Sequence, residues 1–161
     1  MMLILHNALQ EFFYVNAYEK GIVFNKAIRG QFIQRFTTPV GPSEVVSPMK
    51  GKTGASGTAK ITVEAAGSTL CIDATIKGFD PVVAYLNYGK VGTNGPTVVD
   101  FSSKKKSAGR FLGCGKLKDL GVKDTELAAK ILDKPDLFYF TFHQNITGSG
   151  VFKNSIRGQL T

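Results

Sequence analysis

Strict alternation between apolar and polar residues in two neighbouring stretches constrains this fold more than any other sequence feature. Every second side chain is apolar in residues 58–64 and again in residues 69–77. Such a period of two buries one face of an extended strand, whereas a helix requires a period near 3.6. A short Ala-Gly-Ser segment separates the two stretches, as expected of a turn. The pattern predicts two adjacent strands, each buried on one face.

The rest of the chain reads as further short strands with a single helix. The additional strands are expected at 82–88, 97–101, 137–143 and 155–160, separated by turns rich in glycine. A helix is expected at 125–133, capped by Asp124 or Thr125 and ended by Pro135. One short helix in a long crossover between many strands indicates an all-β sandwich.

An aromatic segment followed by Ile-Arg-Gly-Gln occurs twice. Residues 13–18 and 24–32 correspond in order to residues 138–143 and 152–160. We interpret this as a duplication. The complete unit then spans 36–161, and residues 1–33 are predicted to be the last two strands of a preceding unit. Because a lone hairpin is marginally stable in water, this segment is expected either to dock on the complete unit or to belong to a tandem array.

Charge and cysteine content limit the classes of function. The formal net charge of +8 favours anionic partners, and no apolar run reaches the roughly 20 residues of a membrane span. The spacing of Cys71 and Cys114 excludes CxxC chemistry, which leaves either two buried thiols or one disulfide. The apolar stretch at the N-terminus is too short for a signal peptide. The chain is therefore either intracellular or lacks its true N-terminus, and we favour the second.

Five short blocks occur in a fixed order along the complete unit. They are Gly-Pro-Ser-Glu-Val at 41–45, Ala-Ser-Gly-Thr-Ala at 55–59, Leu-Cys at 70–71, Asn-Gly-Pro-Thr-Val-Val at 94–99, and the pair 138–143 with Ile-Arg-Gly-Gln-Leu at 156–160. In this order they resemble the CHRD domain, found in chordin and in many microbial and eukaryotic extracellular proteins. Because that family tends to place a second cysteine where Cys114 stands, the resemblance implies a Cys71–Cys114 disulfide and an oxidising compartment. We predict an immunoglobulin-like or superoxide-dismutase-like Greek-key β-sandwich.

One block departs from the family in a way that bears on function. Members often carry Ala-His-Ile-His-Gly in the third strand, where this chain has Tyr85 and Asn87 in place of the two histidines. These positions share one face of the strand, so a His pair there could join the later strand's His in a metal site or polar cluster. Here only His143 remains. We therefore expect no metal site, no cofactor and no catalytic residue.

Three further features are a repeated arginine, a glycosylation sequon and a basic segment. Arg29 and Arg157, in the repeated motif, are expected to be structural, with Ile facing the core and Gly admitting a close neighbour. Asn145 begins a glycosylation sequon, expected in the exposed connector between the last two strands. A basic segment suits sulfated glycans or acidic surfaces, or else forms a solvated loop that shields a sheet edge. Its members are Lys104, Lys105, Lys106, Arg110, Lys116 and Lys118.

The sequence as a whole favours a non-catalytic extracellular module that binds a protein or matrix ligand. Two alternatives stay open: a metal-binding or enzymatic relative of superoxide-dismutase-like sandwiches, and a polyanion- or glycan-binding module acting through the basic segment. Nucleic acid is not expected as a partner, because no aromatic residues interleave with the lysines.

Overall fold

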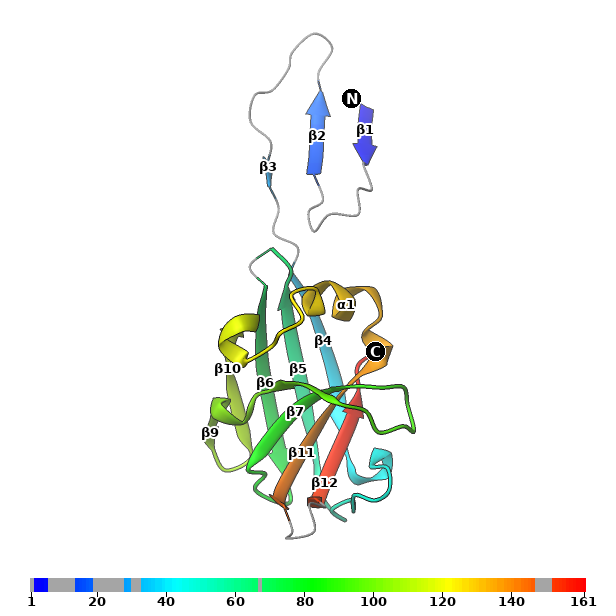
Figure 1. Cartoon of the computed structure of the whole chain (residues 1–161), viewed down its shortest axis with the longest axis vertical. Helices are drawn as coiled ribbons and strands as arrows, with labels where there is room; N and C mark the ends of the chain where they lie inside the picture. The colour runs from blue at the N-terminus through cyan, green and yellow to red at the C-terminus, as the bar shows by residue number, and fades with distance from the viewer. Residues whose placement is uncertain (1, 6–13, 19–27, 30–32, 67, 147–151) are drawn as a thin grey trace.

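The fold is an all-β sandwich with one short helix, as predicted. The computed structural model describes residues 2–5, 14–18, 28–29, 33–66, 68–146 and 152–161. Two antiparallel sheets face each other, and α1 (Leu127–Asp133) lies across one end (Figure 1). The finer assignment, to an immunoglobulin-like or superoxide-dismutase-like Greek key, stays a prediction.

The larger sheet has the strand order β4-β5-β6-β10-β9 and the smaller one the order β12-β11-β7-β8. The larger contains β4 (Ile33–Val40), β5 (Ser56–Glu64), β6 (Thr69–Lys77), β10 (Arg110–Lys116) and β9 (Lys105–Ser107). The smaller contains β12 (Phe152–Gln159), β11 (Phe138–Ile146), β7 (Val83–Tyr88) and β8 (Thr97–Asp100). Among the described residues, four single-turn 3-10 helices lie in the connections: η1 (Pro42–Glu44), η2 (Ser102–Lys104), η3 (Leu117–Leu120) and η4 (Pro135–Leu137).

The core lies between the sheets and follows the alternation in the sequence. Ile61 on β5 and Ile72 on β6 are directly opposite each other and almost fully buried. Phe140 and Phe142 on β11 pack toward them from the smaller sheet, and their rings stack with centroids 5.9 Å apart. The strands predicted at 58–64, 69–77, 82–88, 97–101, 137–143 and 155–160 are all present, with shifts of a few residues at their ends. Helix α1 begins two residues later than expected, and Pro135 follows its end.

The basic segment is not the loop that the sequence suggested. Residues 105–107 and 110–116 form the hairpin β9–β10, and β10 pairs with β6 along seven residues. Phe111 anchors β10 because its side chain is fully buried in the core. Gly113 and Gly115 have no side chains, so they weaken the alternation of apolar and polar residues that would have predicted this strand. A further strand, β4, was also not predicted; it begins at Ile33, which pairs with Glu64.

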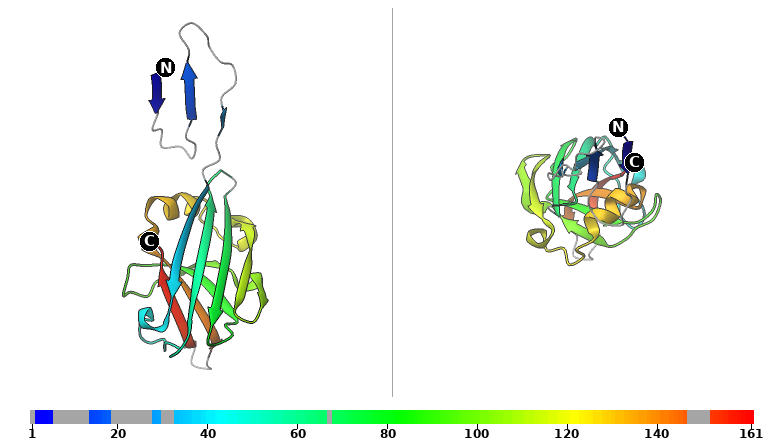
Figure 2. Two further views of the ribbon diagram at one scale, coloured as in Figure 1. Left: turned by 180° about the vertical axis from the view of Figure 1, so that it is seen from behind. Right: turned by 90° about the horizontal axis from the view of Figure 1, so that it is seen from above.

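The two sheets meet closely along the edge strands β4 and β12 (Figure 2). The Thr38 hydroxyl on β4 donates a hydrogen bond to the Gln159 carbonyl on β12 at 2.6 Å. A Cβ atom at Gly158 would lie only 2.1 Å from the Pro39 carbonyl oxygen. The glycine of the repeated motif is therefore required by the approach of a neighbouring backbone, as predicted.

The N-terminal strands pair with one another. β1 (Met2–Leu5), β2 (Tyr14–Tyr18) and β3 (Ile28–Arg29) form a small antiparallel sheet in which Tyr14 is opposite Arg29. In the complete unit the matching arginine, Arg157, is opposite Thr141 instead, so the two registers differ by two residues. The assignment of residues 1–33 to a preceding repeat stays a prediction, and residues 13, 24–27 and 30–32 of the proposed copy lie outside the described residues.

Candidate functional site

The outward face of the smaller sheet carries most of the buried polar side chains of the described residues. Seven polar or charged side chains are buried: Thr38, Asn87, Thr141, His143, Ser155, Arg157 and Gln159. All but Thr38 project from β7, β11 and β12 on the side away from the core, since their neighbours along each strand are core residues. The alternation of apolar and polar residues alone would predict that this face is exposed to solvent. Because its polar side chains are buried, other segments of the chain must cover it.

Two connecting segments cover that face. The segment 41–55, between β4 and β5, runs beside β12, where Gly41 pairs with Arg157 and Gly51 with Ser155. The segment 89–96, between β7 and β8, folds over the sheet. The two meet where the Asn94 side-chain amide donates to the Ser47 carbonyl at 2.7 Å. Blocks 41–45, 94–99 and 156–160 of the sequence resemblance are thereby brought together.

Arg157 holds the second of these segments in place. Its guanidinium donates to the carbonyls of Thr93 at 2.6 Å and Lys90 at 3.0 Å, and it lies over the Tyr139 ring with 3.5 Å from Cζ to the centroid. Burial lowers the pKa of Arg157, while Tyr139 and the Glu44 carboxylate act in the opposite direction. The side chain is 1% exposed, so it is a structural element of the fold, as predicted.

Gln159 also helps to hold the covering segment 89–96 in place. Its side-chain amide nitrogen lies within hydrogen-bond distance of three carbonyls: Asp136 at 2.7 Å, Phe138 at 2.9 Å and Gly89 at 3.0 Å. Its side-chain oxygen accepts from Arg157 at 3.1 Å. The motif Ile-Arg-Gly-Gln thus places Ile156 in the core, Gly158 against β4, and the two polar side chains under the covering segment.

A pocket of about 260 Å³ remains open between the two covering segments. Its floor is formed by side chains of β7, β11 and β12: Tyr85, Asn87, Tyr139, Thr141, His143 and Phe152. Its walls are Pro48 and Met49 from the first segment, and Asn94, Gly95 and Thr97 from the second segment and the start of β8. Concave sites of mixed aromatic and polar lining are where proteins usually bind small ligands.

A chain of hydrogen bonds fixes the polar part of the floor. The Thr97 hydroxyl donates to the Asn87 side-chain oxygen at 2.8 Å, and the Asn87 amide donates to the Thr141 hydroxyl at 2.9 Å. At the rim, the Gly95 backbone N–H donates to the Tyr139 hydroxyl at 2.8 Å. Asn87, at one family histidine position, links three strands of this sheet. The floor is therefore pre-formed.

His143 is held at the far end of the pocket. Its Nδ1 lies 2.7 Å from the Ser155 hydroxyl, and its ring stacks on Phe152 with centroids 4.0 Å apart. Burial lowers the pKa of His143 to about 4, so the ring is neutral near pH 7. Ser155 is 1% exposed and does not line the pocket. The Ser–His pair therefore does not present a nucleophile to a bound molecule.

The sequence placed part of this pocket correctly. Positions 85 and 87 were expected to share a face of their strand, beside the later strand's histidine in relatives, and Tyr85, Asn87 and His143 line one cavity. The contributions of Met49, Asn94 and Phe152 were not predicted, because these residues reach the pocket from segments distant in sequence. A usable signal was present in β11, where Tyr139, Thr141 and His143 alternate with core phenylalanines.

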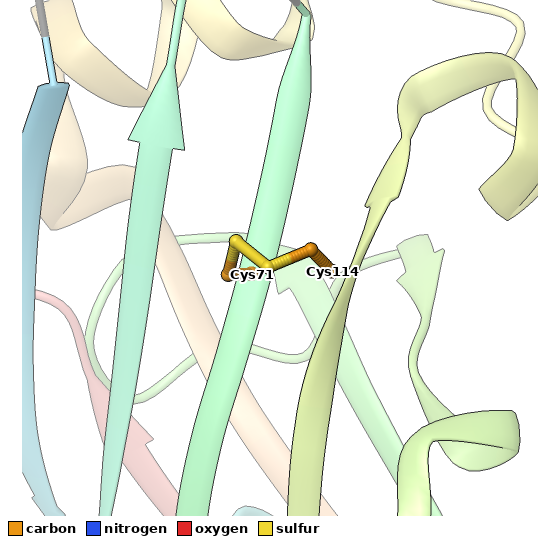
Figure 3. The surroundings of a disulfide bond; sticks show 2 residues. All are labelled: Cys71 and Cys114. Atoms are coloured by element: carbon orange, nitrogen blue, oxygen red, sulfur yellow. A yellow bond between two sulfur atoms is a disulfide. The ribbon is translucent and has the colours of Figure 1, made fainter.

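The cysteines form a disulfide on the opposite side of the molecule. Cys71 and Cys114 are directly opposite each other on β6 and β10, with an S–S distance of 2.07 Å (Figure 3). Cys71 lies on the outward side of its strand, because its neighbours Leu70 and Ile72 are core residues, and Cys114 belongs to the neighbouring strand.

The basic residues do not all present free charges. Lys105 pairs with Asp80 at 2.7 Å, which lowers the pKa of Asp80 mainly through that hydrogen bond. Arg110 pairs with Asp73. The exposed members are Lys106, Lys116 and Lys118, while Lys104 is half-buried. Lys105 and Lys106 lie on the edge strand β9, where charged side chains discourage pairing with another sheet.

The sequon residue Asn145 lies in β11 opposite Lys153, within a strand and not in the connector that the sequence suggested. Thr147, its third residue, lies outside the described residues. Among the described residues, no three His, Cys, Asp or Glu side chains gather closely enough to hold a metal ion. In the same part of the chain, no helix has the length and apolar character of a membrane span.

Comparison with known proteins supports one family. No curated protein and no solved structure matches the chain. The model of the CHRD domain matches residues 36–160, which include every residue of the pocket and all of both sheets except the first three residues of β4. The chain therefore belongs to the CHRD domain family.

Proposed function

We propose that this chain is a non-catalytic extracellular module that binds a protein or matrix ligand at the pocket on the smaller sheet. One observation carries the proposal: the pocket is pre-formed and combines aromatic with polar side chains, yet its lining among the described residues includes no carboxylate, no serine and no cysteine. CHRD domains are generally non-enzymatic, typically extracellular interaction modules, which agrees with this function.

The disulfide supports the extracellular part of the proposal. Cys114 is exposed and Cys71 half-buried, so both lie within reach of cellular reductants. Structural disulfides persist mainly in oxidising compartments. The pairing therefore favours a secreted protein over a cytosolic one. Intact mass before and after reduction and alkylation, on protein made in an oxidising compartment, tests this directly.

Binding to an immobilised basement-membrane extract, measured by biolayer interferometry, tests the function. We expect saturable binding by the full chain that falls when Thr97→Arg fills the mouth of the pocket. The matched variant Thr58→Arg, on an exposed position of the larger sheet, should bind as the wild type does. Turnover of a substrate that disappears in His143→Gln would overturn the proposal, and stoichiometric copper or zinc in the purified protein would favour the metal-binding alternative.

Polyanion binding through the basic segment is the second proposal, favoured by the exposure of Lys106, Lys116 and Lys118. Retention on immobilised heparin tests it. Because Lys105 is paired with Asp80, charge reversal is best placed at Lys106 and Lys116. Elution at the wild-type salt concentration after both reversals would contradict this proposal.

A further inference from the structure

The pocket has no lining side chain that is charged near neutral pH. His143 is neutral because burial lowers its pKa to about 4. Burial, together with the charge of Asp100, raises the pKa of Tyr85, so its phenol keeps its proton. The remaining floor and wall residues are amides, hydroxyls, aromatic rings and apolar side chains. A charged ligand would therefore lose its hydration without meeting an opposite charge.

Several residues that line the pocket retain hydrogen-bonding capacity. Asn87 uses one of its two amide hydrogens, toward Thr141, and Asn94 uses one, toward Ser47. Within the described residues the Tyr85 hydroxyl has no hydrogen-bond partner. His143 has its Nδ1 bonded to Ser155, which leaves its other ring nitrogen. Amides and hydroxyls both donate and accept, so the complementary ligand also carries groups of both kinds.

Aromatic and apolar side chains form the other part of the pocket. The Tyr85 ring centroid lies 6.1 Å from that of Phe152 and 6.0 Å from that of His143. Pro48 and Met49 add apolar side chains to the lining from the covering segment 41–55. The cavity of about 260 Å³ is smaller than the roughly 300–1,000 Å³ usual for drug-sized ligands. It suits a single ring with one apolar face.

We propose that the pocket binds one neutral sugar ring of an extracellular glycan, with the apolar face of the sugar on the Tyr85 ring, its edge against Phe152, and its hydroxyls on Asn87, Asn94 and the Tyr85 phenol. The inference rests on the proposed function, since it names the ligand of that binding site. A sugar combines an apolar face with many hydroxyls that donate and accept. A proline ring from a peptide would satisfy the aromatic side but leave the amides without partners.

Saturation-transfer NMR on the full chain, made without glycosylation in a bacterial periplasm, tests the proposal. The probes are the methyl glycosides of glucose, galactose and mannose, with glucuronate and glucosamine as charged counterparts. We expect at least one neutral glycoside to bind with a Kd on the order of 1 mM, as a ligand of this size allows. Tyr85→Phe should weaken this binding about 3- to 10-fold by removing one hydrogen bond. Tyr88→Phe, which removes a phenol hydroxyl outside the pocket from the same strand, should leave it unchanged.

The outcomes separate this inference from the function on which it rests. Binding of only the charged sugars, equal binding by both tyrosine variants, or no binding by any neutral glycoside well above 1 mM would overturn the sugar assignment. A proline-rich peptide that shifts the backbone resonances of the pocket residues would replace the sugar with a protein ligand. If matrix binding persists in these cases and still depends on Thr97, the binding module stands and only its ligand class is wrong. If matrix binding is also absent, both proposals fail.

Discussion

The outward faces of the two sheets follow the same alternation of apolar and polar residues, but they differ in exposure to solvent. On the larger sheet the outward positions are half-buried or exposed, and even Leu112 remains 44% exposed. On the smaller sheet His143 and Arg157 are 1% exposed, although they occupy equivalent outward positions. The covering segments 41–55 and 89–96 make the difference. Without them, the smaller sheet would also be a solvated face.

This contrast shows where polar side chains support the fold. A polar group that is removed from water contributes to stability only if it is hydrogen-bonded, and leaving its partner unpaired is costly. On the larger sheet water replaces any lost partner, so most substitutions there should be tolerated. On the smaller sheet Arg157 and Gln159 hold backbone carbonyls of the covering segment 89–96. The other buried polar side chains of this face are hydrogen-bonded to neighbouring side chains.

The Cys71–Cys114 disulfide is an exception to this asymmetry. It lies on the outward face of the larger sheet, yet its removal should lower the free energy of unfolding more than any other change considered. Replacing both cysteines by alanine is expected to lower the free energy of unfolding by about 4 kcal/mol, the chain-entropy value for a loop of 43 residues. The effect arises in the unfolded chain, since the pairing of β6 with β10 does not require the sulfur atoms. Urea denaturation measures it, with reduced wild-type protein as the control. A loss below about 1 kcal/mol would show that the unfolded chain is already constrained.

Arg157→Met should give the largest loss on the covered face, about 3 kcal/mol. The substitution keeps an apolar stem but leaves the carbonyls of Lys90 and Thr93 without their donor. Arg35→Met, at an exposed position on the larger sheet, should change stability by less than about 0.5 kcal/mol. Urea denaturation of both variants checks the pair. Equal losses would mean that burial by the covering segments does not distinguish the two faces.

Acidification should destabilise the covered face through His143. The pKa of this ring is lowered to about 4 in the folded protein, against 6.5 for an ordinary histidine, so the unfolded chain binds more protons between these values. The contribution of the neutral ring to the free energy of unfolding is fully present above pH 6.5. It decreases by about 3 kcal/mol in total as the pH falls toward 4.

His143→Gln provides the control, because glutamine can keep a hydrogen bond to Ser155 but does not titrate. The difference in unfolding free energy between wild type and variant, measured by urea denaturation from pH 7 to pH 4, should decrease across this range. A difference that is independent of pH would contradict the assignment of a neutral, buried ring to the folded state.

The sequence predicted the elements built by local pattern and missed those defined by distant contacts. The strand at 69–77 was predicted at its observed ends because every second residue points into the core. β10 was missed because Gly113 and Gly115 break the pattern. At Gly115, a side chain would collide with Leu120, which follows on a separate turn. No pattern within one strand reveals such a neighbour.

The candidate site was predictable to the same extent. The shared face of positions 85, 87 and 143 follows from strand geometry and antiparallel pairing. The burial of Asn87 and His143 does not follow from strand geometry, because it depends on covering segments that are distant in sequence and meet at Asn94 and Ser47, 47 residues apart along the chain. A period of two shows which way a side chain points. It does not show whether water or another segment lies there.

A matched pair of threonines gives the smallest and sharpest test of the two faces. Thr141 on β11 is buried and accepts a hydrogen bond from Asn87, whereas Thr58 on β5 is exposed. Thr141→Val should cost about 1–2 kcal/mol, because the Asn87 amide loses its acceptor inside the covered floor. Thr58→Val should be nearly neutral, since valine has the same branched shape and suits a strand equally well. Both variants replace one hydroxyl with a methyl group, so their difference in unfolding free energy measures the covering of the face and nothing of strand propensity. If the two costs are equal, the covering segments do not exclude water from the floor of the pocket, and the neutral, pre-formed site on which ligand binding depends is absent in solution.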